Sequence, residues 1–202
     1  MSKVPVESYF GDPSAWIEVE YMGNYDINSD HFSLVLLNSV KEKNRQISFI
    51  TDKDYASMMQ LRVNGVEFTA RTLPIEIVYD FITSYNDPDR FLIIVNGYKD
   101  GVYHSVLWNG YDDFTFDLKM SDAVHLSLGH GMKIFILKDL FASLASDHFE
   151  RVNKVGMPVK MLPLEILKKA LDDCIADERF EQAKQIKEEI DRRNPSESIS
   201  LN

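Results

Sequence analysis

Hydrophobic and polar positions along the chain switch between a period of two and a period near 3.6, which predicts a mixture of strands and helices. Short apolar or alternating stretches bounded by polar turns predict strands at residues 16–22, 32–38, 45–51, 91–95, 102–108, 114–118 and 133–137. Longer stretches with helical spacing predict helices at residues 55–63, 74–84, 122–128 and 139–145. Because the strands occur in hairpin runs separated by helices, we expect an α+β fold, with helices packed on a mixed or antiparallel sheet.

Turn-forming and capping residues indicate where several of these elements end. Asn64-Gly65 follows the first predicted helix as a stop signal. Asn96-Gly97 and Asp100-Gly101 predict a loop before the strand at residue 102. Ser121 is placed to cap the third helix at its N-terminus, and Gly129 is expected to end it.

The C-terminal region carries its own helical pattern. Two short amphipathic helices are predicted between residues 164 and 193, joined by Asp177-Glu178-Arg179, and they form an α-helical hairpin. Short helices are marginal in water without a packing surface, so we expect their apolar stripes to be covered by the chain's own domain, by a twin or by a partner. The predicted protein-interaction residues are Leu167, Leu171, Phe180, Ala183, Ile186 and Ile190.

These patterns divide the chain into four parts. A main domain is predicted at residues 15–146, followed by a linker at 147–160 that contains Gly156-Met157-Pro158. The helical hairpin occupies residues 161–194, and a polar tail at 195–202 is expected to be disordered.

Composition limits the class of protein. The chain has 202 residues, 45% of them hydrophobic, and a formal charge of −10. A protein that coats nucleic acid non-specifically needs basic patches, so the acidic balance argues against one. It does not exclude a nuclease, because carboxylates hold the cations that assist phosphodiester cleavage. Neither a signal segment nor an apolar run of membrane-spanning length is present, and Cys174 stands alone, so we expect a cytoplasmic protein without membrane association.

The order of residues in the C-terminal hairpin is also distinctive. Leu167-Lys168-Lys169-Ala170-Leu171 is followed by Arg179-Phe180-Glu181-Gln182-Ala183 and then by Ile186-Lys187-Glu188-Glu189-Ile190. This order resembles the UVR motif, the helical hairpin shared by the B and C subunits of bacterial nucleotide-excision repair. The resemblance implies a bacterial protein whose hairpin binds a protein partner.

The main domain, from about residue 32 to residue 144, resembles the bifunctional nuclease domain family. Residues 117–128 carry the most specific match, which includes Ser121-Asp122-Ala123 before an apolar helix. Asp100-Gly101 before a strand, and Arg71-Thr72-Leu73 with a helical Glu76, also match the family. The resemblance implies a homo-oligomer, such as a dimer, with DNase and RNase activity on a nucleic-acid substrate.

Four residues of these motifs are candidates for catalysis: Asp117, Ser121, Asp122 and Glu76. Paired carboxylates can hold a divalent cation, Mg²⁺ or Mn²⁺, that activates water on a phosphodiester. Structural roles are open for each of the four, and for Glu76 the alternative is an ordinary solvated surface position. Ser121 and Asp122 suit the first turn of a helix, and Asp117 has Lys119 or Arg71 as an alternative ion-pair partner. The identity of the metal is left open.

A second interpretation is a non-catalytic oligomeric adaptor that recruits a protein partner through the hairpin. Two departures from the family pattern motivate it. Tyr55-Ala56-Ser57 stands where the family usually has Glu-Ala-Gln, and Pro74-Ile75-Glu76 stands where it has Thr-His-Asp. A titratable Glu and a His, both suited to metal or acid–base chemistry, are therefore absent from these positions.

Overall fold

The computed structural model describes residues 11–26, 31–65, 73–84, 87, 90–109, 114–147, 159, 162, 164–176 and 178–194. The chain divides into two compact units, Met1–Gly97 with Tyr103–Val152, and Tyr98–Val102 with Asn153–Asn202. Most of the predicted linker and the whole predicted tail at 195–202 lie outside the described residues, so the domain limits stay predictions.

The described strands form one sheet in the order β6-β5-β4-β7-β1-β2-β3-β8. The pair β4–β7 is parallel, whereas β1–β2, β1–β7, β2–β3, β3–β8 and β5–β6 are antiparallel. The sheet is therefore mixed, and the predicted α+β fold is confirmed. The strands are β1 (Trp16–Asp26), β2 (Phe32–Ser39), β3 (Arg45–Asp52), β4 (Phe91–Lys99), β5 (Val102–Asn109), β6 (Phe114–Leu118), β7 (Ile134–Leu137) and β8 (Ser146–Asp147).

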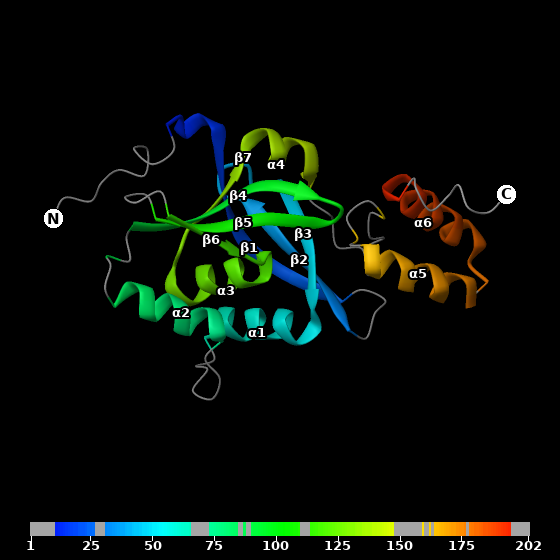
Figure 1. The fold of residues 1–202 in the computed structure, drawn as a ribbon, viewed down its shortest axis with the longest axis horizontal. Coiled ribbons are helices and arrows are strands. Elements are labelled where there is room, and N and C mark those ends of the chain that lie inside the picture. The colour runs from blue at the N-terminus through cyan, green and yellow to red at the C-terminus, as the bar shows by residue number, and fades with distance from the viewer. Residues whose placement is uncertain are drawn as a thin grey trace. The chain divides into compact units, whose positions relative to one another are not determined.

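Helices α1 (Lys53–Val63), α2 (Pro74–Thr83) and α3 (Met120–His130) lie together on one side of the sheet, and α4 (Lys138–Leu144) lies on the other (Figure 1). A 3₁₀ turn, η2 (Pro13–Ala15), precedes β1. Helix α3 packs between α1 and α2, and α4 packs on β7 and β1. The apolar run of β4 is buried from Phe91 to Val95, as expected for a strand inside the sheet with both faces covered. No described helix has the length and apolar character needed to cross a membrane.

The predicted loop at Asn96-Gly97 is wrong. Strand β4 continues through these residues to Lys99, and the chain reverses at Asp100 and Gly101, with φ values of 52° and 86°. Positive φ at both central residues is the signature of a two-residue type I′ turn, for which Asp-Gly is a preferred sequence. One tight turn therefore replaces the expected loop.

Helix α3 begins earlier and ends later than its capping signals suggested. Lys119 is the N-cap, and Ser121 is buried inside the first turn, so Ser121 does not cap the helix. The helix begins early because Met120, 6% exposed, is packed into the core. Gly129 lies within the helix, which ends at His130 with Gly131 in the left-handed conformation at φ 69°. The glycine that ends the helix is thus the next one along the chain.

The second unit contains the predicted hairpin, formed by α5 (Leu164–Ala176) and α6 (Phe180–Arg193), which pack against each other. Leu167, Ala183 and Ile186 are buried, as is Cys174, which behaves as a small hydrophobe. Leu171 and Ile190 are half-buried. Phe180, by contrast, is 67% exposed.

Helix α5 ends in a Schellman motif. The N–H of Arg179 donates to the carbonyl of Cys174 at 2.8 Å, and the N–H of Glu178 donates to the carbonyl of Ile175 at 3.1 Å. The residue in the left-handed position is Glu178, at φ 58°, where a side chain carries a conformational cost that glycine avoids.

We therefore expect Glu178→Gly to stabilise the hairpin by about 0.5–1 kcal/mol, because the strain removed exceeds the added entropy of the unfolded chain. Hydrogen-exchange protection of the α6 amides would measure the change. The control is Glu181→Gly, an exposed position inside α6, which should lower the protection. Equal or lower protection in Glu178→Gly would contradict the strain argument.

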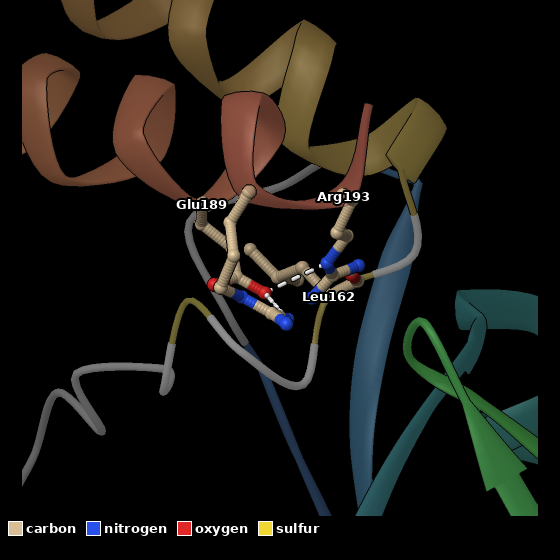
Figure 2. A network of polar contacts seen from close by, with 4 residues as sticks. Leu162, Glu189 and Arg193 are labelled. Carbon is tan, nitrogen blue, oxygen red and sulfur yellow. Dashed lines mark hydrogen bonds and ion pairs between the residues drawn. The ribbon is translucent and has the colours of Figure 1, made fainter. Parts of the chain in front are cut away.

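Glu189 holds the C-terminal end of α6 (Figure 2). Its carboxylate, 6% exposed, accepts hydrogen bonds from Arg192 at 2.7 and 2.8 Å and from Arg193 at 2.7 Å. Arg193 also donates to the carbonyl of Leu162. The hydrogen bonds from Arg192 outweigh burial and, together with those from Arg193, lower the pKa of Glu189 from 4.5 to about 2. A buried acidic residue thus ties α6 to the segment before α5.

This network predicts an acid-sensitive hairpin. Because the folded-state pKa of Glu189 lies below its unfolded value, its stabilisation is present above about pH 4.5 and is lost as the pH falls toward about 2. Protection factors of the α6 amides should fall over this interval in the wild type and change less in Glu189→Gln. In Glu188→Gln, an exposed neighbour, the pH dependence should match the wild type. An identical pH dependence in Glu189→Gln would refute the assignment.

Candidate functional site

The predicted residue Asp122 lies in the first turn of α3, where it faces Tyr55 of α1. The Tyr55 hydroxyl donates a hydrogen bond to the Asp122 carboxylate. Burial raises the pKa of Asp122, and the Tyr55 hydrogen bond and the charge of Lys119 only partly oppose that rise. Burial and the neighbouring Asp122 charge likewise raise the pKa of Tyr55. The site thus contains a half-buried carboxylate held by one phenol.

His125, one turn further along α3, completes this cluster and is fully buried. Its ring lies edge-on to the Tyr55 ring at 4.9 Å, and its Nε2 is 3.2 Å from the Tyr55 carbonyl oxygen. Burial and the nearby Arg62 lower the pKa of His125 to about 4, so the imidazole is neutral near pH 7. Nε2 therefore carries the proton that it donates to Tyr55, and Nδ1 carries a lone pair that finds no hydrogen-bond partner among the described residues.

Glu76 forms a buried ion pair with Arg62 of α1, with 2.5 Å between Oε1 and Nη2 and side chains 10% and 11% exposed. Its other oxygen accepts the Leu73 N–H at 2.8 Å, which caps the N-terminus of α2. Burial raises the pKa of Glu76, but the hydrogen bonds from Leu73 and Arg62 outweigh it and leave the pKa lowered. Glu76 is therefore an ionised residue that joins α2 to α1.

Gly129 of α3 allows the Arg62–Glu76 ion pair to pack directly against this helix. A Cβ at position 129 would lie 2.3 Å from Arg62 Nη1 and 3.1 Å from Glu76 Oε1. Arg62 and Glu76 fit only because this helical position has no side chain. The role of Gly129 is close packing of the three helices rather than helix termination.

Asp117 lies elsewhere, on β6, with its side chain 86% exposed. Its Oδ1 is 3.3 Å from Nε2 of His104 on β5. Neither predicted alternative partner is confirmed, because the observed partner is His104, which is adjacent only through strand pairing, and Arg71 lies outside the described residues.

The structure thus brings Asp122 and Glu76 to one three-helix cluster, where Tyr55 experiences the charge of both, and keeps Asp117 apart. Ser121 is buried in α3 beside Asp122. Within the part of the chain that the structure describes, no three His, Cys, Asp or Glu residues are grouped as metal ligands. Asp122 and Glu76 are instead engaged by Tyr55 and Arg62, so the three predicted carboxylates do not form one cation site.

Sequence reasoning missed Tyr55 and Arg62 as parts of this cluster, and it discounted His125 as a partner of Asp122 because the family usually has a small apolar residue there. A signal was present, because Tyr55 and Arg62 are seven residues apart and share a face of α1. Asp122, His125 and Gly129 share a face of α3 in the same way. Polar residues on the inward face of a helix indicate a buried polar cluster, provided that the inward face is known.

Comparison with known proteins fits this architecture. Residues 35–148 match the Bifunctional nuclease domain family, so more than half of the chain, including α1, α2 and α3, is covered. The chain belongs to this family. Among curated proteins no sequence matches it significantly. The C-terminal hairpin lies beyond the matched residues, and its resemblance to the UVR motif stays a prediction.

Proposed function

We propose that the protein is a nuclease that hydrolyses phosphodiester bonds of DNA or RNA, with Asp122 as its acid–base residue. The observation that carries the proposal is the position of Asp122, a half-buried carboxylate with a raised pKa inside the matched family domain. A carboxylate whose pKa is raised toward neutrality accepts a proton from attacking water more effectively than an exposed one.

In this mechanism Asp122 takes the proton of the water whose oxygen attacks phosphorus. Tyr55, through its hydroxyl, fixes the direction of the carboxylate. Glu76 and Arg62 act as positioning residues because their ion pair sets α1 and α2 against α3. Ser121 shapes the turn that carries Asp122.

A divalent cation, Mg²⁺ or Mn²⁺, is part of the proposal as an added component rather than a described site. Its chemistry would be charge neutralisation on the phosphate and activation of water. Asp117, exposed on β6, is retained as its predicted ligand. A dimer and a cytoplasmic location are likewise expected and await measurement.

The test is cleavage of end-labelled single-stranded DNA and RNA by the purified full chain, with Mg²⁺, with Mn²⁺ and with EDTA. We expect cleavage of at least one substrate. Asp54→Asn, which removes an exposed carboxylate adjacent to Tyr55 in sequence, should leave the rate unchanged. Absence of cleavage under all conditions would reject the nuclease function, and cleavage unaffected by EDTA would reject the cation.

A second function, recruitment of a protein partner, is favoured by the end of the hairpin where α5 meets α6. Ile175 and Phe180 flank this turn and are 52% and 67% exposed. Two large apolar side chains in water at one place are typical of a protein-interaction surface. In this role the hairpin binds the protein partner, and the main domain is the part of the chain to which the hairpin is attached.

Phe180→Asp tests this adaptor role without disturbing the buried residues Ala183 and Ile186. A pull-down with the tagged full chain should lose its captured protein in Phe180→Asp and keep it in Lys184→Asp, a charge change at an exposed position of α6. Equal capture by both variants would reject the hairpin end as the binding surface.

A further inference from the structure

A pair of titratable side chains outside the three-helix cluster lies on neighbouring strands of the sheet. His104 of β5 stands between Asn96 of β4 and Asp117 of β6, and each ring nitrogen faces one side-chain oxygen. Nδ1 is 2.5 Å from Asn96 Oδ1, and Nε2 is 3.3 Å from Asp117 Oδ1. The side chains of His104 and Asp117 are 57% and 86% exposed, so solvent ions reach both.

The Asn96 contact fixes the tautomer of the neutral ring. An amide oxygen only accepts, so Nδ1 must carry the proton that it donates to Asn96. In the neutral imidazole Nε2 then carries the lone pair, and this lone pair points toward a carboxylate. Two electron-rich atoms at this separation need a proton or a metal ion between them.

The distance of 3.3 Å matches the separation of two ligands of one metal ion. A charge-assisted N–H···O hydrogen bond is shorter, about 2.7–2.9 Å. Two ligands that hold zinc at about 2.1 Å in tetrahedral geometry lie about 3.4 Å apart. Donation of the second ring N–H to a fixed acceptor is also the usual arrangement around a metal-binding histidine.

Gly97 supports the same arrangement from β4. A Cβ at position 97 would lie 3.2 Å from His104 Cβ, which is tighter than an ordinary contact. The absence of a side chain at Gly97 therefore leaves room for His104 to lie against β4 and reach Asn96. Glycine inside a strand often marks such a close approach.

We propose that His104 Nε2 and Asp117 Oδ1 form a surface site for a divalent transition-metal ion of the zinc type, with water in the remaining positions. Imidazole together with one carboxylate suits Zn²⁺, Co²⁺ or Ni²⁺, whereas Mg²⁺ prefers oxygen ligands alone. The inference goes beyond the proposed nuclease function, because it concerns metal binding by His104 and does not depend on Asp122; Asp117 alone appears in both proposals.

The test is calorimetric titration of the metal-free full chain with Zn²⁺, and absorption spectroscopy with Co²⁺. We expect one saturable site in the wild type, loss of it in His104→Ala and in Asp117→Asn, and about 10–100-fold weaker binding in Asn96→Leu. Gly97→Ala keeps every ligand atom and should also weaken binding. The control His31→Ala removes another exposed histidine and should bind like the wild type.

Two results would overturn the site. One is the absence of saturable Zn²⁺ binding, which would make the pair an ordinary surface ion pair. The other is wild-type affinity in His104→Ala, which would place the metal elsewhere. Displacement of Zn²⁺ by equimolar Mg²⁺ would contradict the role of the imidazole. Loss of nuclease activity with metal binding intact would bear only on the Asp122 mechanism.

Discussion

Asp122→Asn should lower the rate of phosphodiester cleavage by about 10²–10⁴-fold, the range expected when a general base is removed. The asparagine has the same shape and keeps an oxygen that accepts the Tyr55 hydrogen bond, so the fold should survive. It cannot take the proton of the attacking water. Single-turnover cleavage at saturating enzyme measures the loss without interference from substrate binding.

Two comparisons make this result interpretable. Circular dichroism melting of Asp122→Asn should resemble that of the wild type, because the carboxylate is only half-buried. Asp54→Asn should cleave at the wild-type rate. If Asp122→Asn retains full activity, or loses it only together with its folded structure, Asp122 is not the catalytic base.

Arg62→Met should destabilise the main domain by about 3–5 kcal/mol, the cost of leaving one partner of a buried ion pair without its counter-charge. Glu76 is 7% exposed and would remain as an isolated carboxylate between α1, α2 and α3. Urea denaturation followed by the fluorescence of Trp16 and Trp108 measures the change in the free energy of unfolding.

The double variant Arg62→Met/Glu76→Leu is the matched control for this cost. It removes both charges, so it should recover part of the lost stability, although the Leu73 N–H loses its acceptor. A loss below about 1 kcal/mol in Arg62→Met, the value typical of exposed pairs, would show that the pair is not buried in solution.

The arrangement of elements could be predicted because it depends on local patterns. The apolar run at Phe91–Val95 identified a strand, and the helical spacing at Leu167 and Ile186, which are both buried, identified the hairpin. The prediction of a loop at Asn96-Gly97 was wrong because strand pairing overrides the turn propensity of these two residues. The tight turn forms at Asp100-Gly101 instead.

The candidate site was less accessible to sequence reasoning. Asp122 was identified through its motif, but its partner Tyr55 is 67 residues away in the chain and becomes adjacent only when α1 packs on α3. His104 has no metal-binding signal in the sequence, because zinc-type spacing of ligands along the chain is absent. His104 and Asp117 become neighbours because β5 pairs with β6, and their spacing along the chain does not reveal this contact.

The central claim is that Asp122, held by Tyr55, transfers the proton in catalysis, and the pH dependence of single-turnover cleavage in Tyr55→Phe tests it most directly. The Tyr55 hydrogen bond lowers the pKa of Asp122 against the effect of burial, so its removal raises that pKa further. Because the base must be ionised, activity falls on the acidic side, and this limb should move to higher pH in Tyr55→Phe than in the wild type. An acidic limb at the same pH in both proteins would contradict the account.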